Sequence, residues 1–301
     1  GFVTSVNQYA LLRFIAGIGL AGELGAGITL VSEVLPTRLR GYGTTLVATV
    51  GLMGAVFANF IARKFDWQIA YFIGGGLGLL LLLARVSIFE SGIFTKLKEA
   101  HVQRGNFFML FNNRKRFTKF IGNIFIGLPI WFAIGILITF SPEFAVALHI
   151  DGVVSAGDAI MYGYIGLAAG DLLSGFISQK LKSRKKVVLL YITMTLCSFL
   201  LFLYSPFKGV NEFYIICALV GFSIGYWALF VTIAAEQFGT NLRATVATTV
   251  PNFIRWTVVP LTFSFQYLRD EVGIINGALI VGIATIIIAL IALQSIEETF
   301  S

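Results

Sequence analysis

Charged residues are scarce in this sequence, and so are the residue types that build metal and nucleotide sites. Only 12% of the residues are Asp, Glu, Lys or Arg, whereas about a quarter are charged in typical globular domains. The two cysteines, Cys197 and Cys217, suggest neither a disulfide framework nor a metal site, and the two histidines have no partner at ligand spacing. No Gly-x-x-x-x-Gly-Lys-Ser/Thr sequence occurs, which argues against ATP as the energy source. We therefore expect no bound cofactor.

Long apolar windows fill most of the chain. The sequence is 57% hydrophobic, with a mean hydropathy of +0.87. Each window is near the ~20 residues that a helix needs to cross a bilayer, and none shows the alternation of a membrane β-barrel strand. We predict an all-α polytopic membrane protein with nine spans, at residues 10–34, 43–62, 69–89, 118–140, 155–178, 187–205, 212–235, 244–268 and 274–294.

The net charge of +7 is distributed unevenly between the two sides of the predicted spans. If the spans alternate in direction, one side collects fifteen Lys and Arg residues and the other side collects four. Basic loops remain on the cytoplasmic side of a membrane, so this asymmetry favours a lipid bilayer over nucleic acid as the partner. It places the C-terminus in the cytoplasm.

Two similar stretches lie 203 residues apart, "SEVLPTRLRG" at 32–41 and "AEQFGTNLRA" at 235–244. Aligning them pairs Glu33 with Glu236 and Arg40 with Arg243, and both stretches connect two predicted spans. Internal repeats of this kind are typical of secondary transporters, although chance similarity of two amphipathic loops is the alternative. We predict a partial N-terminal half at 1–89, a cytoplasmic linker at 90–117 and a six-helix half at 118–301. The chain would then hold nine of twelve transmembrane helices and lack the first three.

Several motifs resemble those of the major facilitator superfamily. The first span reads "LLRFIAGIGLAGELGAGITLVSEVLPTRLRG", with an Arg-xxx-Gly-x-Gly pattern that begins at Arg13. "FESGIF" at 89–94 is similar to the sequence that closes the first half in the metabolite:proton symporter and sugar porter branches. "GDLLSGFISQKLKSRKK" at 170–186 resembles the family's cytoplasmic loop, but Gln179 stands where an acid is expected. The resemblance implies a helical bundle, and it links Arg13 to proton coupling.

Among the charged residues inside predicted spans, Glu23 and Arg255 are the leading candidates for a substrate and proton pathway. Glu23 lies where an ionised carboxylate costs at least ~2.5 kcal/mol, so it is either a proton carrier or a structural carboxylate paired with another helix. Arg255 is either an anion-binding group or the partner of an acid. Asn252 and Trp256 share the helix face of Arg255, and Pro251 and Pro260 should distort this helix. The candidate pathway residues are Glu23, Arg255, Arg13, Asn252 and Trp131.

A second set of charged residues is expected to form a cytoplasmic gate. Salt bridges among such residues hold two halves together in one state and break in the other. Helix-end pairing is the alternative for Asp171. The predicted gate comprises Glu33, Arg38, Arg40, Asp171, Arg184, Glu236 and Arg243.

These observations predict a proton-coupled symporter of a small organic, anionic metabolite that works by alternating access. A facilitative sugar porter needs no titrating carboxylate and is the first alternative. An intramembrane enzyme needs clustered acids or histidines, and a channel needs a filter or charge ring. We expect a monomeric, multi-pass protein of the cell inner membrane that uses the proton gradient and is not an enzyme. Its partners are a small-molecule substrate and the lipid bilayer.

Overall fold

The computed structural model describes residues 2–35, 37–85, 105–206 and 208–300. All of the regular structure in these ranges is helical, with one isolated bridge between Asp151 and Gly209. The helices are α1 (Val6–Ala21), α2 (Glu23–Val34), α3 (Thr37–Lys64), α4 (Trp67–Arg85), η1 (Phe107–Leu110), α6 (Arg114–Ile126), α7 (Leu128–Phe132), η2 (Ala133–Ile138), α8 (Ser141–Ala147), α9 (Ala156–Leu181), α10 (Arg184–Leu203), α11 (Val210–Ser223), α12 (Trp227–Glu236), α13 (Thr240–Val272) and α14 (Ile274–Ser295).

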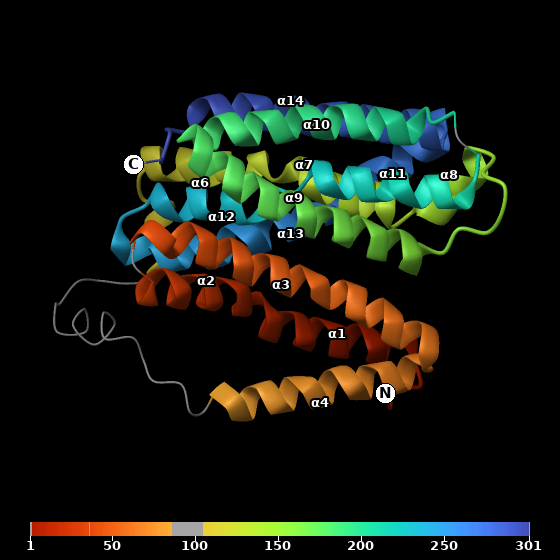
Figure 1. Ribbon diagram of the computed structural model, residues 1–301, viewed down its shortest axis with the longest axis horizontal. Coiled ribbons are helices and arrows are strands. Elements are labelled where there is room, and N and C mark those ends of the chain that lie inside the picture. The colour runs from red at the N-terminus through yellow and green to blue at the C-terminus, as the bar shows by residue number, and fades with distance from the viewer. Residues whose placement is uncertain (1, 36, 86–104, 207, 301) are drawn as a thin grey trace.

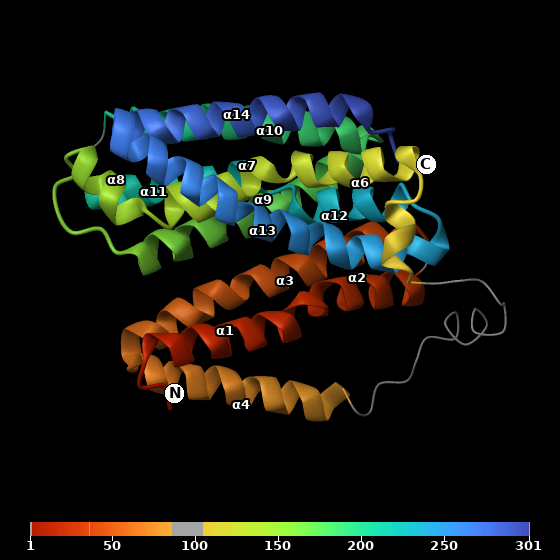
Figure 2. The same cartoon turned by 180° about the vertical axis from the view of Figure 1, so that it is seen from behind.

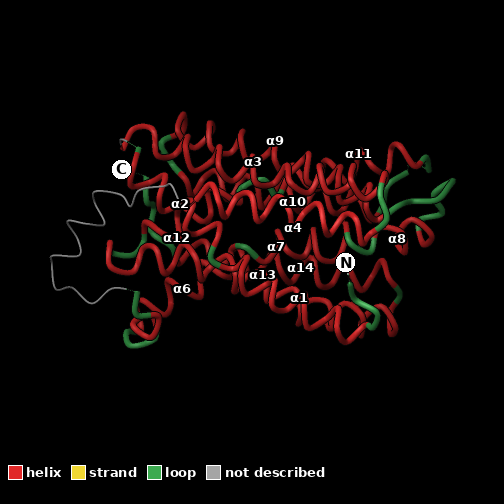
Figure 3. Tube along the Cα trace, turned by 90° about the horizontal axis from the view of Figure 1, so that it is seen from below, coloured by secondary structure: helices red, strands yellow, loops and turns green. Residues whose placement is uncertain are grey.

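The predicted all-α membrane fold is confirmed in the described part of the chain. In the described residues, each of the nine predicted spans falls mainly on helix, whereas residues 86–89 of the third span and 90–104 of the predicted linker lie outside the described residues. Seven of the helical segments are long and apolar enough to cross a membrane. The other two predicted spans are the pair α1 and α2, and α13, which carries Arg243, Arg255 and Arg269 among its apolar residues. The helices run along the long axis of the molecule, and most loops lie at its two ends (Figure 3).

The helices form two groups (Figure 1). We call α1–α4 the N-terminal group and α6–α14 the C-terminal group. The groups meet where α3 packs against α9 and α12, and where α2 packs against α13, as the view from behind also shows (Figure 2). Gly25 of α2 lies so close to Thr248 of α13 that any side chain at position 25 would collide with it.

The large hydrophobic core belongs to the C-terminal group. Its tightest helix pair is α9 with α11, where Gly166 and Gly170 lie against the backbone of Ala218 and Phe222. Small residues allow such close approach, which drives helix association in lipid, where the hydrophobic effect does not. In contrast, α1 and α4 present rows of exposed apolar side chains, as expected of helices whose surroundings are hydrocarbon.

Three of the predicted spans are interrupted inside the membrane-crossing segment. The breaks lie at Gly22, between α1 and α2, at Gly127, between α6 and α7, and at residues 224–226, between α11 and α12. Gly22 and Gly225 are 203 residues apart, which is also the offset of the sequence repeat, and the same offset relates the starts of α3 at Thr37 and of α13 at Thr240. The repeat therefore extends from the sequence to the helix boundaries.

The prolines of α13 do not produce a comparable interruption. The helix assignment of α13 is continuous from Thr240 to Val272, through both Pro251 and Pro260. The irregular helix is instead the one that follows Gly127: α7 has Pro129 in its first turn and continues into the π-helical segment η2. The helix assignment thus breaks at Gly22, Gly127 and Gly225 but not at Pro251 or Pro260, and a milder distortion of α13 at the prolines remains a prediction.

Candidate functional site

A cavity of about 460 Å³ lies between the two helix groups. Residues from α1, α2 and α3 line one side of it, and residues from α7, η2, α9, α12 and α13 line the other. Most of these residues are apolar, but the lining includes two charged side chains of opposite sign, Glu23 and Arg255. The structure thus brings together the two residues that the sequence analysis singled out from opposite ends of the chain.

Aromatic side chains surround the guanidinium group of Arg255. The Arg255 Cζ atom lies 5.7 Å from the ring centroid of Trp227, within the range of a cation–π interaction. The Trp131 ring packs edge-on against Trp227, with 6.2 Å between centroids, and Tyr164 lines the same cavity. The Trp131 Nε1 atom is buried and has no hydrogen-bond partner within the described chain. The cavity therefore offers one cation, one carboxylate and several ring faces.

Glu23 is placed by the break in the first span. It is the first residue of α2, and Gly22 separates it from Ala21, the last residue of α1. The last carbonyls of a helix lack intrahelical partners, and the amide of Asn252 from α13 donates a 2.6 Å hydrogen bond to the Ala21 carbonyl. Asn252 also accepts a 3.3 Å hydrogen bond from the Arg255 Nη1 atom. Asn252 belongs to the predicted pathway set, and the structure places it between Arg255 and the end of α1, two residues before Glu23.

The break between α11 and α12 is held by polar groups of neighbouring helices. The hydroxyl of Thr195 donates to the freed Ser223 carbonyl at 3.0 Å, and the hydroxyl of Tyr226 donates to the Ile126 carbonyl at 2.9 Å. The carboxylate of Asp171 accepts a 2.7 Å hydrogen bond from the backbone N–H of Ala228, in the first turn of α12. These bonds satisfy backbone groups that would otherwise be costly to bury. They also fix Trp227, the first residue of α12, against the cavity.

Asp171 does not occupy the position expected of a gate residue. Its side chain is fully buried inside the C-terminal group, where it joins α9 to the start of α12. Its second carboxylate oxygen has no hydrogen-bond partner in the part of the chain that the structure describes. The helix-end alternative describes this geometry better than the gate does.

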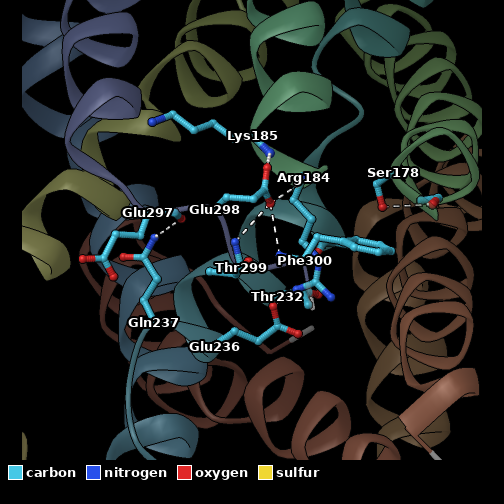
Figure 4. Close-up of polar contacts among 12 residues, drawn as sticks. Ser178, Arg184, Lys185, Thr232, Glu236, Gln237, Glu297, Glu298, Thr299 and Phe300 are labelled. Carbon is cyan, nitrogen blue, oxygen red and sulfur yellow. Dashed lines mark hydrogen bonds and ion pairs between the residues drawn. The ribbon is translucent and has the colours of Figure 1, made fainter. Parts of the chain in front are cut away.

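Arg184 and Glu236 of the predicted gate form an ion pair at the end of the bundle that carries the C-terminus (Figure 4). The ring of Phe300 lies over the guanidinium group of Arg184, 5.9 Å from its Cζ atom. Both members of the ion pair belong to the C-terminal group. The side chains of Glu33, Arg38 and Arg40 lie outside the described residues, and the Arg243 Nε atom is buried without a hydrogen-bond partner among the described residues. A gate between the groups remains a prediction.

The residues that follow α14 form a strap across this end, which we define as residues 296–300. The Glu298 carboxylate accepts hydrogen bonds from the backbone N–H groups of Arg184 at 3.0 Å and Lys185 at 3.2 Å, and from the hydroxyl of Ser183 (Figure 4). Partial burial raises the pKa of Glu298, but these hydrogen bonds outweigh it and hold the pKa below its ordinary value. Glu298 thus supplements Ser183 as the N-terminal cap of α10.

Two other candidates lie away from the cavity. Arg13 is exposed on α1 and hydrogen-bonds to Tyr71 of α4, and it does not line the cavity. Trp256 is 67% exposed, so it does not share the cavity-facing surface of Arg255 as expected. The expectation failed because residues at i and i+1 on a helix differ by about 100° in direction, and the cavity is narrower than that arc.

Sequence reasoning missed three features of the site region. Trp227 and Tyr164 carry no charge and resemble other membrane aromatics, although Trp227 lies next to the position that the repeat aligns with Glu23.

At the opposite end of the bundle, Arg63 of α3 forms an ion pair with Asp158 of α9, to which Asn59 also donates a 3.1 Å hydrogen bond. This cluster joins the two helix groups, and only the packing of α3 on α9 brings it together.

Two further observations bear on the chemistry. Among the described residues, no group of three His, Cys, Asp or Glu side chains is placed to hold a metal ion. A second cavity, of about 210 Å³, is lined by residues of α3, α9 and α12 and has no charged side chain in its lining. The larger cavity is therefore the better candidate for a site that binds a polar or charged ligand.

Two helix groups related by a repeat, with a partly polar cavity between them and broken helices at the cavity, define the class of secondary transporters. The sequence agrees with this class: residues 1–255 match the pattern of the Major Facilitator Superfamily, and the chain belongs to this family. It is a multi-pass helical membrane protein.

Three relatives show the range of similarity. The chain is 25% identical over 260 residues to a probable 4-methylmuconolactone transporter of Cupriavidus pinatubonensis (strain JMP 134 / LMG 1197), which covers 81% of this chain and 58% of that protein. It is 25% identical over 272 residues to the putative niacin/nicotinamide transporter NiaP of Bacillus subtilis (strain 168), covering 84% and 64%. A shorter match, 35% identical over 86 residues, is to the 4-hydroxybenzoate transporter PcaK of Pseudomonas putida, covering 27% and 19%. The chain thus spans less than two thirds of the length of each of these three relatives.

Proposed function

We propose that this protein is a proton-coupled symporter that moves a small organic anion across the membrane by alternating access. The observation that carries the proposal is the presence of Glu23 and Arg255 in one cavity between the two helix groups. An arginine presents a planar set of donors that matches a carboxylate, and an intramembrane carboxylate is suited to carry a proton.

We further propose that the anion is an aromatic or similarly flat carboxylic acid. The faces of Trp131, Trp227 and Tyr164 provide stacking surfaces beside the Arg255 guanidinium group. The relatives support this class, because niacin and 4-hydroxybenzoate are both ring carboxylic acids and both occur in the relatives' names. The substrate is carried without covalent change, so the protein is not an enzyme.

The orientation and surroundings are part of the same proposal. The basic loops and the strap at residues 296–300 face the cytoplasm, and the protein acts as a monomer in the cell inner membrane. The charge asymmetry of the loops supports this orientation. A reporter enzyme fused to the C-terminus, active only in the cytoplasm, tests the orientation, and an active periplasmic reporter at the same position would contradict it.

The proposed function is tested with the protein expressed from its complete reading frame and reconstituted in liposomes that contain a pH-sensitive dye. Niacin, 4-hydroxybenzoate, an osmolyte and glucose are added outside, one at a time, to the wild type, to Glu23→Gln and to Glu212→Gln. Glu212 is an exposed carboxylate on α11 that does not line the cavity and serves as the matched control.

We expect the lumen to acidify when one of the two acids is added, and we expect Glu23→Gln to abolish acidification while Glu212→Gln preserves it. Uptake of glucose without a change in pH would contradict the proposal and favour a facilitative sugar porter. Acidification that survives in Glu23→Gln would remove Glu23 from the proton pathway.

A further inference from the structure

The Asn252 side chain contacts both Arg255 and the break beside Glu23. Its amide nitrogen donates to the Ala21 carbonyl at 2.6 Å and to the Thr248 carbonyl at 2.8 Å, and its amide oxygen accepts from Arg255 Nη1 at 3.3 Å. The Thr248 bond stays within α13, whereas the Ala21 bond crosses from the C-terminal to the N-terminal helix group. A short path of hydrogen bonds thus joins the guanidinium group to the backbone next to Glu23.

The bond to Ala21 depends on the broken helix. In a continuous helix the Ala21 carbonyl would accept the N–H four residues later, and a side chain from another helix would have little to gain there. Because α1 ends at Ala21 and α2 begins at Glu23, this carbonyl belongs to the unpaired last turn of α1. A movement of the Asn252 amide therefore changes the partner of the carbonyl two residues before Glu23.

We propose that Asn252 couples the occupancy of the anion site at Arg255 to the proton affinity of Glu23. This inference rests on the proposed symport function and names the residue through which the two ligands sense each other. An anion bound to Arg255 competes with the Asn252 oxygen for the guanidinium N–H donors. The amide that loses this bond reorients, the Ala21 carbonyl loses or shifts its donor, and the first turn of α2 turns Glu23 with respect to the cavity.

Coupling of this kind has a measurable consequence in both directions. If the bound acid raises the proton affinity of Glu23, then protonation of Glu23 must raise the affinity for the acid by the same factor. Coupling factors of about 5 to 150 are typical, so the affinity for the acid should depend strongly on pH in the wild type. Substitution of a residue that only holds two helices together would leave the pH dependence of this affinity unchanged.

The experiment compares Asn252→Leu with Asn276→Leu in the protein expressed from its complete reading frame. Asn276 is a matched control, because its amide also bonds to the carbonyl four residues earlier in sequence, at 3.1 Å, but it is exposed and away from the cavity. Asn252→Thr is made alongside, since a threonine hydroxyl keeps the bond to the Thr248 carbonyl but is too short to serve Ala21 and Arg255 as well. It replaces Asn252→Leu as the test if the leucine variant does not fold.

Three quantities are measured with the acid that the wild type takes up fastest from the panel above. They are the dissociation constant of the radiolabelled acid between pH 5.5 and 8.5, its exchange across liposomes without a gradient, and the number of protons that enter with each acid. We expect Asn252→Leu to retain measurable exchange of the acid, at a reduced rate because Asn252 belongs to the predicted pathway. The factor by which its dissociation constant changes between pH 5.5 and 8.5 should be at least about fivefold smaller than in the wild type, since fivefold is the lower end of typical coupling factors. Fewer protons should enter with each acid.

Other results separate this inference from the proposed function. If Asn252→Leu keeps the wild-type pH dependence and proton entry, the coupling role of Asn252 is overturned and the symport proposal stands. If the folded variant loses exchange together with proton entry, Asn252 serves to bind the acid, and the coupling role is again overturned. If the wild type itself moves no acid or no proton, the proposed function fails and this inference fails with it.

Discussion

At the scale of single residues, the cavity holds two charges in a setting where charges are expensive. Arg255 is stabilised there by the Trp227 ring face and by the Asn252 oxygen. Trp131 is different, because its ring packs against Trp227 while its N–H lacks any acceptor within the described chain. A buried donor without a partner is unusual in a folded protein, and a ligand oxygen would satisfy it.

We therefore predict that the Trp131 N–H contributes to substrate binding. Trp131→Phe keeps an aromatic ring but removes the N–H donor, so we expect the dissociation constant of the transported acid to rise about threefold to tenfold, the worth of one neutral hydrogen bond. Trp256→Phe is the control, since Trp256 is 67% exposed and lies outside the cavity lining. Equal affinities in the wild type and in Trp131→Phe would show that this N–H stays unused.

At the scale of helices, the sequence predicted where the spans lie but not where they break. Long apolar windows located the seven helical segments that are long and apolar enough to cross a membrane, because the length of a membrane helix is set by the thickness of the bilayer. Gly22 and Gly225 are two of 32 glycines, and local sequence does not distinguish them. Their breaks depend on side chains that arrive from other helices, Asn252 at the first and Asp171 and Thr195 at the second.

The candidate site was predictable to a similar extent. The cost of charge in a membrane singled out Glu23 and Arg255, and the cavity contains both. The same reasoning does not identify uncharged partners, and it misplaced Asp171, whose carboxylate serves a backbone N–H of α12. Residues whose role comes from tertiary hydrogen bonds to the backbone leave little trace in one sequence.

The strap at residues 296–300 gives a prediction for an element outside the membrane. The folded-state pKa of Glu298 lies below its unfolded value of about 4.5, so its stabilising effect is present above that pH and is lost as the pH falls through the folded-state pKa. Glu298→Gln should therefore lower the free energy of unfolding of the purified protein at pH 7. The decrease should be about 1 kcal/mol or less, because Glu298 is exposed.

The check is a pair of thermal unfolding series in detergent, at pH 7 and at pH 4 and below. The difference in unfolding temperature between the wild type and Glu298→Gln should decrease as the pH falls. Gln294→Glu, which adds a carboxylate at an exposed position near the same end, controls for net charge. If the difference in unfolding temperature stays constant or increases in acid, the ionised Glu298 carboxylate does not stabilise the start of α10.

At the scale of the whole molecule, the two helix groups touch at both ends of α3 and α9. Gly175 lies against Thr45 at the end that carries the C-terminus, and Gly157 lies against Asn59 at the opposite end. Among the side chains that the structure describes, an ion pair between these helices lies only at the opposite end, from Arg63 to Asp158, with Asn59 donating to the same carboxylate oxygen. If the groups rock against each other, this cluster must separate when the cavity opens toward that end.

Asp158→Asn should therefore shift the population toward the state that is open at this end. The shift is read from the reaction of a cysteine at Ala55, a cavity-lining position, with a maleimide that cannot cross the membrane, in a background where exposed Cys197 is replaced by serine. Because exposed ion pairs contribute modestly, the expected increase in labelling rate is about twofold to fivefold. Asp270→Asn is the matched control, since Asp270 pairs with Arg269 on its own helix and joins no two groups. An unchanged or slower rate in Asp158→Asn, with Asp270→Asn equal to the wild type, would mean that the contact between α3 and α9 is maintained by packing alone.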